Sequence, residues 1–290
     1  MDWTERNMEN IGYYNGTFAP MDQLMIPALD RGVYFGDGVY EALRVEKHRF
    51  FALREHLARF RDSLAFLRIP FPMTDEALTA ILQEAADRVD SDSQQLYFQV
   101  TRATAVRTHA FPETGKANLL VLSRGVPLAD LVEYRRVTVL PDTRWGHCNI
   151  KSLNLIPGVL AAQSAKERGC SEAVFQRDGV VSECSSSNLL LLKNGVLRTA
   201  PTDERILPGV TRGHFLMLAR QIGIPVDEAA FTLKEMEQAD ELMITSTSAH
   251  GLPVGWIDEK VVCGRDKTLL RKLQKAYREY FWDSLGIDRH

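Results

Sequence analysis

Three dipeptides that favour tight turns constrain the fold of this chain most strongly. They are Asn15-Gly16, Asp178-Gly179 and Asn194-Gly195, and each of the last two joins two apolar runs. Such dipeptides occupy the two-residue turns of β-hairpins, where both residues adopt positive φ. Residues 96–100 alternate apolar and polar side chains, which is typical of a half-buried strand. We therefore expect antiparallel strands in both halves of the chain.

Helical patterns separate these strands. Between Ala52 and Arg68, apolar side chains recur every three or four residues, which predicts one buried helix face, and Pro70 ends the pattern. Thr74 is placed to cap a second helix, and Thr232 with Glu235 forms a capping box. Further helices are predicted over 157–169, from Pro208-Gly209-Val210-Thr211 onward, and over 265–284.

The same reading predicts further strands over 117–123, 136–141 and 241–246, and short strands and turns over 11–51. Antiparallel strands with interspersed helices indicate two α+β domains. The segment 124–130 contains Gly125 and Pro127 and is the most favourable boundary. We expect a smaller N-terminal α+β domain over 1–125 and a larger C-terminal α+β domain over 126–290, which carries Lys151.

Composition excludes several classes of protein. The chain has 290 residues, a formal net charge of −3 and no basic block, so we expect neither nucleic acid nor an anionic membrane as a partner. The stretch Met1 to Asn10 has no apolar core, so no signal peptide is expected, and no apolar run reaches the ~18 residues of a membrane span. Four cysteines without paired spacing indicate free thiols in a reducing cytoplasm. The seven histidines lack metal-ligand spacing, so no metal is predicted.

Two stretches carry the candidate chemistry. Lys151 lies in an apolar stretch, beside Ile150 and Leu153. An apolar setting favours a neutral amine, which can attack a carbonyl and form a Schiff base. On the local sequence alone, a lysine whose stem packs at a strand end is the simpler interpretation. The second stretch is Glu183-Cys184-Ser185-Ser186-Ser187-Asn188, an acid, three hydroxyls and an amide before an apolar run, which alone indicates only a polar turn.

Together the two stretches resemble the fold-type IV, pyridoxal-phosphate-dependent aminotransferases. Further segments keep that family's order and spacing between about residue 12 and residue 285. They are Asp30-Arg31-Gly32, Phe35-Gly36-Asp37-Gly38-Val39-Tyr40-Glu41, Glu55-His56, Tyr97-Phe98-Gln99-Val100-Thr101-Arg102, Arg107-Thr108-His109-Ala110-Phe111-Pro112-Glu113, Lys151-Ser152-Leu153-Asn154-Leu155 and Val210-Thr211-Arg212. By itself, Phe35-Gly36-Asp37-Gly38 predicts only a glycine-rich turn, because it lacks the strand and helix context of a dinucleotide site.

The resemblance implies two α+β domains with the active site in the cleft between them, and pyridoxal 5'-phosphate as cofactor. Lys151 would bind the cofactor covalently and move protons, and Glu183 would face the pyridine nitrogen. The residues implied in cofactor binding are Arg59, Lys151, Glu183, Ser186, Ser187, Leu207, Val210, Thr211, Ser246 and Thr247. Arg59 would be the phosphate cation, although an exposed helix arginine is the simpler local interpretation. Val210 and Thr211 would offer amides at a helix N-terminus, where the dipole favours anions.

The resemblance is to the D-amino-acid branch of the family, because a tyrosine, an arginine and a histidine there hold the substrate carboxylate. The matching residues are Tyr40, Arg107 and His109, and an arginine fork suits a carboxylate. Without the family, Arg107-Thr108-His109 would be interpreted as a charged surface loop. The resemblance also implies that this loop reaches in from a neighbouring subunit, so a homodimer is expected.

The expected activity is transamination of D-amino acids, with D-alanine and 2-oxoglutarate giving pyruvate and D-glutamate. An L-branched-chain aminotransferase and aminodeoxychorismate lyase are the alternatives on the same fold. A cofactor-binding protein without turnover is a different class, and its spectrum would not respond to amino acids. The chain departs from the family at Cys184, where glycine is expected, at Pro157-Gly158, and in several extra residues before the first matched strand.

Overall fold

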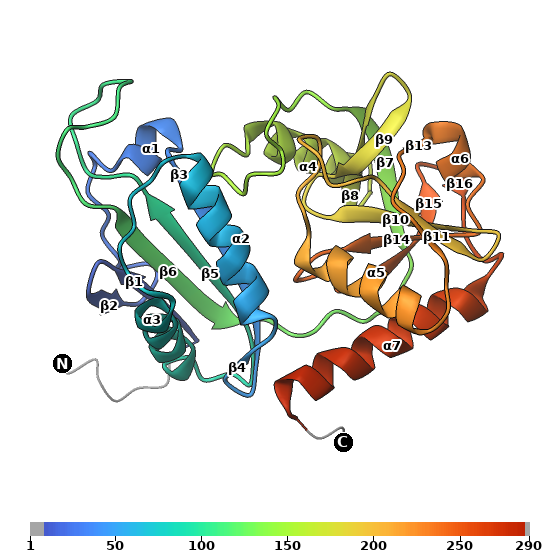
Figure 1. Ribbon diagram of the computed structural model, residues 1–290, viewed down its shortest axis with the longest axis horizontal. Coiled ribbons are helices and arrows are strands. Elements are labelled where there is room, and N and C mark those ends of the chain that lie inside the picture. Colours follow the sequence, from blue (N-terminus) through green and yellow to red (C-terminus); the bar gives the residue numbers. More distant parts are fainter. Residues whose placement is uncertain (1–8, 288–290) are drawn as a thin grey trace. The chain divides into compact units, whose positions relative to one another are not determined.

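A computed structural model describes residues 9–287 of the chain (Figure 1). Its contacts divide the chain into two compact units. Unit 1 comprises the residues up to Leu128 together with Ile150–Asn154, and unit 2 comprises Ala129–Asn149 and the residues from Leu155 onward. The stretch before Glu9, on which most of the expectation about a signal peptide rests, lies outside the described residues.

Unit 1 is built on a six-stranded antiparallel sheet with strand order β2-β1-β6-β5-β3-β4. Its strands are β1 (Asn10–Tyr14), β2 (Thr17–Ala19), β3 (Gly38–Glu46), β4 (Arg49–Phe50), β5 (Ser93–Thr101) and β6 (Asn118–Gly125). The helices are α1 (Arg31–Phe35), α2 (Leu53–Phe66) and α3 (Asp75–Asp87). Leucines of α2 and α3 and a phenylalanine of α2 form one buried cluster with one face of the sheet, which is the core of this unit.

Unit 2 is built on a ten-stranded mixed sheet with strand order β12-β11-β10-β14-β15-β7-β8-β9-β13, and β16 pairs with β15. Its strands are β7 (Arg135–Pro141), β8 (Glu172–Arg177), β9 (Val180–Cys184), β10 (Asn188–Lys193), β11 (Val196–Thr199), β12 (Val226–Asp227), β13 (Phe231–Thr232), β14 (Glu241–Thr245), β15 (Leu252–Ile257) and β16 (Lys260–Val261). The helices are α4 (Ile156–Glu167), α5 (Val210–Gln221), α6 (Leu233–Glu237) and α7 (Lys267–Leu285). The pairs β15–β7, β7–β8 and β11–β12 are parallel.

The predicted hairpins and capped helices are confirmed. Asn15-Gly16, Asp178-Gly179 and Asn194-Gly195 join β1 to β2, β8 to β9 and β10 to β11, and all six residues have positive φ. The Thr74 hydroxyl accepts a hydrogen bond from the Ala77 amide at 3.2 Å, and Thr232 with Glu235 forms the predicted capping box. The α+β class is therefore confirmed in both units.

The region 11–51 was predicted only as short strands and turns, and this prediction was wrong in two respects. Residues 31–35 form the short helix α1, whose first turn is capped by the Asp30 side chain. β3 is nine residues long because its full length pairs with β5. Of the helices that the structure describes, none is both long enough and apolar enough to cross a membrane.

Residues 150–154 make their backbone hydrogen bonds within unit 1. The Tyr40 amide donates to the carbonyl oxygen of Lys151 at 3.0 Å, and the Leu153 amide donates to that of Gly38 at 3.0 Å. Val39 and Ser152 form an antiparallel bridge. Lys151 was predicted to belong to the C-terminal domain, whereas these contacts attach its stretch to the edge of β3.

Candidate active site

Lys151 is fixed in unit 1 through its main chain and its side chain. Its amide donates to the Ser63 hydroxyl on α2 at 3.3 Å, in addition to the β3 contact described above. Its Nζ lies 4.2 Å from the centre of the Tyr40 ring, and that ring stacks on Tyr97 at 5.4 Å. The residue is half-buried, and its amine contacts the face of the Tyr40 ring.

Arg59 is oriented by a buried carboxylate that the sequence analysis did not identify. The guanidinium donates to both oxygens of Glu41 at 2.8 Å, and Nδ1 of His56 lies 2.7 Å from the same carboxylate. His56 and Arg59 are three residues apart on α2 and therefore share a helix face. Although burial acts to raise it, Arg59 and His56 lower the pKa of the Glu41 carboxyl to about 2. Arg59 is thus a pre-oriented cation, as a phosphate site requires.

The three residues predicted to bind the substrate carboxylate lie on β3 and on the loop between β5 and β6. Tyr40 is on β3 with its ring against Lys151. Arg107 and His109 are exposed on the loop, where both side chains pack against the Phe35 ring. A guanidinium and an imidazole, two residues apart and open to solvent, can bind a small carboxylate.

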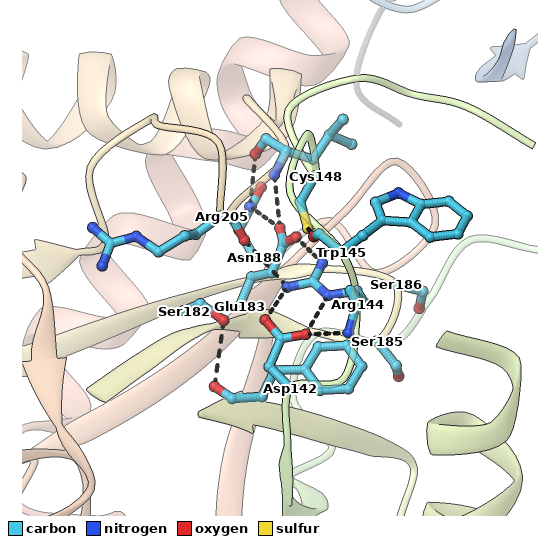
Figure 2. A network of polar contacts seen from close by, with 12 residues as sticks. Asp142, Arg144, Trp145, Cys148, Ser182, Glu183, Ser185, Ser186, Asn188 and Arg205 are labelled. Atoms are coloured by element: carbon cyan, nitrogen blue, oxygen red, sulfur yellow. Dashed lines mark hydrogen bonds and ion pairs between the residues drawn. The ribbon is translucent and has the colours of Figure 1, made fainter. Parts of the chain in front are cut away.

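Glu183 is the centre of a buried polar network in unit 2 (Figure 2). It lies at the end of β9, where the Arg144 guanidinium donates to its Oε1 at 2.5 Å. The Asn188 side chain and the Leu207 amide donate to its Oε2 at 2.9 and 3.0 Å. Burial raises the pKa of Glu183 to about 7, although Arg144 and the Leu207 amide act to lower it. A second cation beside this carboxylate, in addition to Arg144, would stabilise its charged form further.

Arg144, which contacts Glu183, is another residue of this site that was not predicted from the sequence. Its guanidinium also donates to both oxygens of Asp142, at 2.9 and 3.0 Å, and the Asp142 side chain is fully buried (Figure 2). Arg177 donates to the same carboxylate at 3.2 Å. The only signal available in the sequence was an acid and an arginine two residues apart after a predicted strand.

Ser186 and Ser187 make their hydrogen bonds with a second buried acid, Glu172 on β8. The Ser186 amide and hydroxyl donate to Oε1 of Glu172 at 2.6 and 2.9 Å, and the Ser187 hydroxyl donates to Oε2 at 2.7 Å. Burial raises the pKa of Glu172, while these donors act to lower it. Both serine hydroxyl protons are directed at Glu172, so toward another group these oxygens act as acceptors.

The anion site predicted from the sequence falls at the N-terminus of α5. Gly209 is its N-cap residue, and no side chain of the described residues caps this first turn. A Cβ at Gly209 would lie 2.0 Å from Oδ1 of Asn188, so any larger residue there would have to displace that side chain. The amides of Val210 and Thr211 lie in this uncapped first turn, where unpaired N–H groups and the helix dipole favour an anion.

Asn188 connects the Glu183 network to the turn that precedes α5. Its side chain donates to Glu183 and to the Leu207 carbonyl oxygen at 2.9 Å, and its backbone pairs with Thr245 on β14. Ser246 and Thr247 follow that strand directly, and the Ser246 hydroxyl accepts from the Ala249 amide at 3.0 Å. Unit 1 offers an amine and an oriented cation, and unit 2 offers helix amides and a buried acid, which are the kinds of group that pyridoxal phosphate requires.

Comparisons with known proteins define the family. The family model described as Amino-transferase class IV matches residues 38–257, and the chain belongs to that family. It is 37% identical over 263 residues to the D-alanine aminotransferase of Listeria monocytogenes serotype 4b (strain F2365), covering 89% of this chain and 91% of that protein. It is 34% identical over 272 residues to the D-alanine aminotransferase of Staphylococcus epidermidis (strain ATCC 12228 / FDA PCI 1200), covering 92% and 96%.

Solved structures confirm the fold. The branched-chain amino acid aminotransferase from Escherichia coli superposes with a TM-score of 0.84 at 22% identity, covering 94% of each chain. The branched-chain amino acid aminotransferase from Thermobaculum terrenum, in its PLP-bound holo form, gives a TM-score of 0.83 at 23% identity, covering 96% of this chain and 95% of that one. The family is fold type IV and depends on pyridoxal phosphate.

Proposed function

We propose that this chain is a pyridoxal-phosphate-dependent D-amino-acid transaminase that converts D-alanine and 2-oxoglutarate to pyruvate and D-glutamate. The observation that carries the proposal is the similarity, over about nine tenths of the chain, to proteins named D-alanine aminotransferase. Arg107 and His109 lie exposed on one loop, where a guanidinium and an imidazole can bind the carboxylate of a D-amino acid.

The cofactor would be held by residues of both units. Lys151 would bind it covalently, Arg59 and the amides of Val210 and Thr211 would bind its phosphate, and Glu183 would face its pyridine nitrogen. Leu207 would pack on the ring, Ser186 and Ser187 would line the site beyond Glu172, and Ser246 and Thr247 would complete the phosphate cradle. When bound, pyridoxal phosphate withdraws electrons from the substrate α-carbon.

In the proposed reaction, side chains of this protein would move one proton, hold another in place and orient the substrate. The Lys151 amine would take the proton from the substrate α-carbon and deliver it to the cofactor C4′ atom. Glu183, charged beside a cation, would hold the proton on the pyridine nitrogen. Tyr40, Arg107 and His109 would fix the carboxylate, so that only one enantiomer presents its Cα–H bond to Lys151.

We further propose a homodimer. On α4, the apolar side chains of Ile156, Val159 and Leu160 are 68%, 57% and 66% exposed, and their spacing places them on one helix face. A contiguous exposed apolar face of this kind is typical of a protein–protein interface. Light scattering of the holoenzyme would give the subunit number.

We also propose the cytoplasm as the location of the protein. All four cysteines are unpaired thiols, which supports a reducing compartment.

The deciding experiment is an activity screen of the purified holoenzyme with D- and L-alanine, D- and L-glutamate and L-leucine, each with 2-oxoglutarate. We expect pyruvate from D-alanine and none from L-alanine. In Arg107→Ala, apparent affinity for D-alanine should fall roughly 10- to 150-fold, since a charge-assisted hydrogen bond contributes about 1.5–3 kcal/mol. Arg54→Ala, which changes an exposed arginine on α2, is the matched control.

Two results would reject the proposal. A preference for L-leucine would favour the branched-chain alternative. Loss of cofactor in Arg107→Ala, with D-alanine affinity unchanged, would show that the loop is wrongly assigned.

A further inference from the structure

The turn between α1 and β3 has no role in the proposed function, yet it is tied to the Lys151 stretch. The Asn154 side chain donates to the Gly36 carbonyl oxygen at 3.2 Å, and the Leu153 amide donates to that of Gly38 at 3.0 Å. Gly36 adopts a left-handed φ of 61°, which ends α1 and starts the turn into β3. The turn is therefore fixed on the side that faces the lysine stretch.

On its other side, the turn holds two buried arginines through Asp37. Arg31 donates to Oδ2 of Asp37 at 2.7 Å, and Arg102 donates to both oxygens at 2.9 and 3.0 Å. Although burial acts in the opposite direction, these hydrogen bonds hold the pKa of the Asp37 carboxyl below its ordinary value. Arg31 is only 2% exposed. A buried and paired arginine has a fixed guanidinium, which can organise groups around it.

Both arginines extend from Asp37 to the loop that carries Arg107 and His109. Nη1 of Arg31 donates to the Thr108 carbonyl oxygen at 2.7 Å and approaches that of Ala110 at 3.4 Å. The guanidinium carbon of Arg102 lies 3.5 Å from the centre of the Phe111 ring. Residues 107–111 are all exposed, so the main chain of a solvent-facing loop is held by buried groups.

The side chains of the same loop rest on a single ring. The guanidinium carbon of Arg107 lies 4.9 Å from the centre of the Phe35 ring, and the His109 ring lies 5.2 Å from it. Arg31 lies at 4.8 Å from the same ring. The loop thus alternates, with Arg107 and His109 on Phe35 and the carbonyl groups of Thr108 and Ala110 directed at Arg31.

We propose that Phe35 and Arg31 are positioning residues for substrate binding. Arg31 fixes the main chain of the loop, and Phe35 fixes the directions of the Arg107 and His109 side chains before a carboxylate arrives. A free arginine loses rotamer freedom when it binds, and an arginine already stacked on a ring loses less. The inference rests on the proposed function, because it assumes that Arg107 and His109 bind the amino-acid carboxylate.

The test compares Phe35→Leu with Phe35→Tyr in the holoenzyme. Leucine removes the ring face, so KM for D-alanine should rise roughly 2- to 30-fold, the range that corresponds to one cation–π contact, while kcat and the cofactor spectrum change little. Tyrosine keeps the ring, so the KM of Phe35→Tyr should equal that of the wild type. Phe66→Leu, which removes an exposed ring at the end of α2, is the control for loss of a ring elsewhere.

A second readout does not depend on activity. Trypsin must take the Arg107 side chain away from Phe35 before it can cut the Arg107–Thr108 bond, so the rate of this cut reports how firmly the loop is held. We expect faster cutting in Phe35→Leu, with Phe35→Tyr at the wild-type rate. Arg31→Lys, which keeps the charge beside Asp37 but lacks the fork that also reaches Thr108, should also be cut faster.

The outcomes separate this inference from the proposed function. Wild-type KM and wild-type cutting rates in both Phe35→Leu and Arg31→Lys would overturn the inference. A wild type that transaminates no D-amino acid would reject the proposed function, and the cutting rates would still show whether Phe35 and Arg31 hold the loop.

Discussion

Nζ of Lys151 lies 4.2 Å from the centre of the Tyr40 ring, and the Tyr40 amide donates to the Lys151 carbonyl oxygen at 3.0 Å. One residue of β3 therefore contacts both the main chain and the amine of the lysine. Because main chain and amine are both held, the amine has little freedom to search for a carbonyl group. Such preorganisation is what a covalent cofactor site requires.

Lys151→Ala should abolish covalent attachment of the cofactor and all transamination. The alanine variant keeps the backbone contacts of residue 151, so the fold of unit 1 should persist. Borohydride reduction of the wild type, followed by peptide mapping, should place the pyridoxyl group on Lys151. Lys193→Ala is a suitable control, because that amine is already paired with Asp240 in unit 2. A label on Lys193 or Lys166 would contradict the assignment.

Glu183→Gln should retain the cofactor and lower kcat by about 100-fold or more, the range seen when one electrostatic contact to a transition state is lost. Glutamine can still accept hydrogen bonds from Asn188 and Leu207, but a neutral amide does not favour a protonated pyridine nitrogen. Measurements are kcat and the cofactor absorbance that remains after desalting. Glu259→Gln, a change at an exposed side chain, controls for loss of a carboxylate. A nearly normal kcat would exclude the role given to Glu183.

Glu41→Gln should be less stable than the wild type at neutral pH, by a margin that shrinks in acid. The folded-state pKa of Glu41 is lowered from 4.5 to about 2, so its contribution is present above the unfolded value and is lost as the pH falls toward the folded one. The full shift corresponds to about 3 kcal/mol. Between about pH 7 and about pH 3.5, the difference in unfolding free energy should therefore shrink by roughly 1 kcal/mol.

Urea unfolding of both proteins at the two pH values checks this prediction. A difference that stays constant or grows in acid would mean that Glu41 is not charged in the folded state.

Much of the fold could be predicted from the sequence because its signals are local. The turn dipeptides and the helix caps act within four residues, and Lys151 and Glu183 both lie in short distinctive stretches. Arg144 and Glu183 are 39 residues apart, and their pairing depends on how β7 and β9 flank β8. No local pattern encodes that relationship. The same reason explains why Glu41 was not recognised as the partner of Arg59, 18 residues away on another element.

Glu172→Ala should lower the free energy of unfolding by about 2–4 kcal/mol. The change leaves the Ser187 hydroxyl, on a buried residue, without its acceptor, which costs about 1–3 kcal/mol, and removes the bond from the Ser186 amide, on an exposed residue, which contributes a further ~1 kcal/mol. Glu172→Gln keeps one carbonyl oxygen to accept these bonds and should lose less. Unfolding by urea, measured for both variants and the wild type, gives the order. Equal stability of all three proteins would show that the hydrogen bonds from Ser186 and Ser187 to Glu172 do not stabilise the fold.

The close approach of Gly209 to Asn188 has a consequence for protein engineering. Any side chain introduced at position 209 must displace the Asn188 amide, because a Cβ there would lie 2.0 Å from its Oδ1. Asn188 also donates to Glu183 and to the Leu207 carbonyl oxygen, so the displacement would disturb the acid as well as the anion-binding turn. A library that randomises the start of α5 to accept a different cofactor phosphate should therefore keep codon 209 fixed. Otherwise, each variant would alter two chemical functions at once.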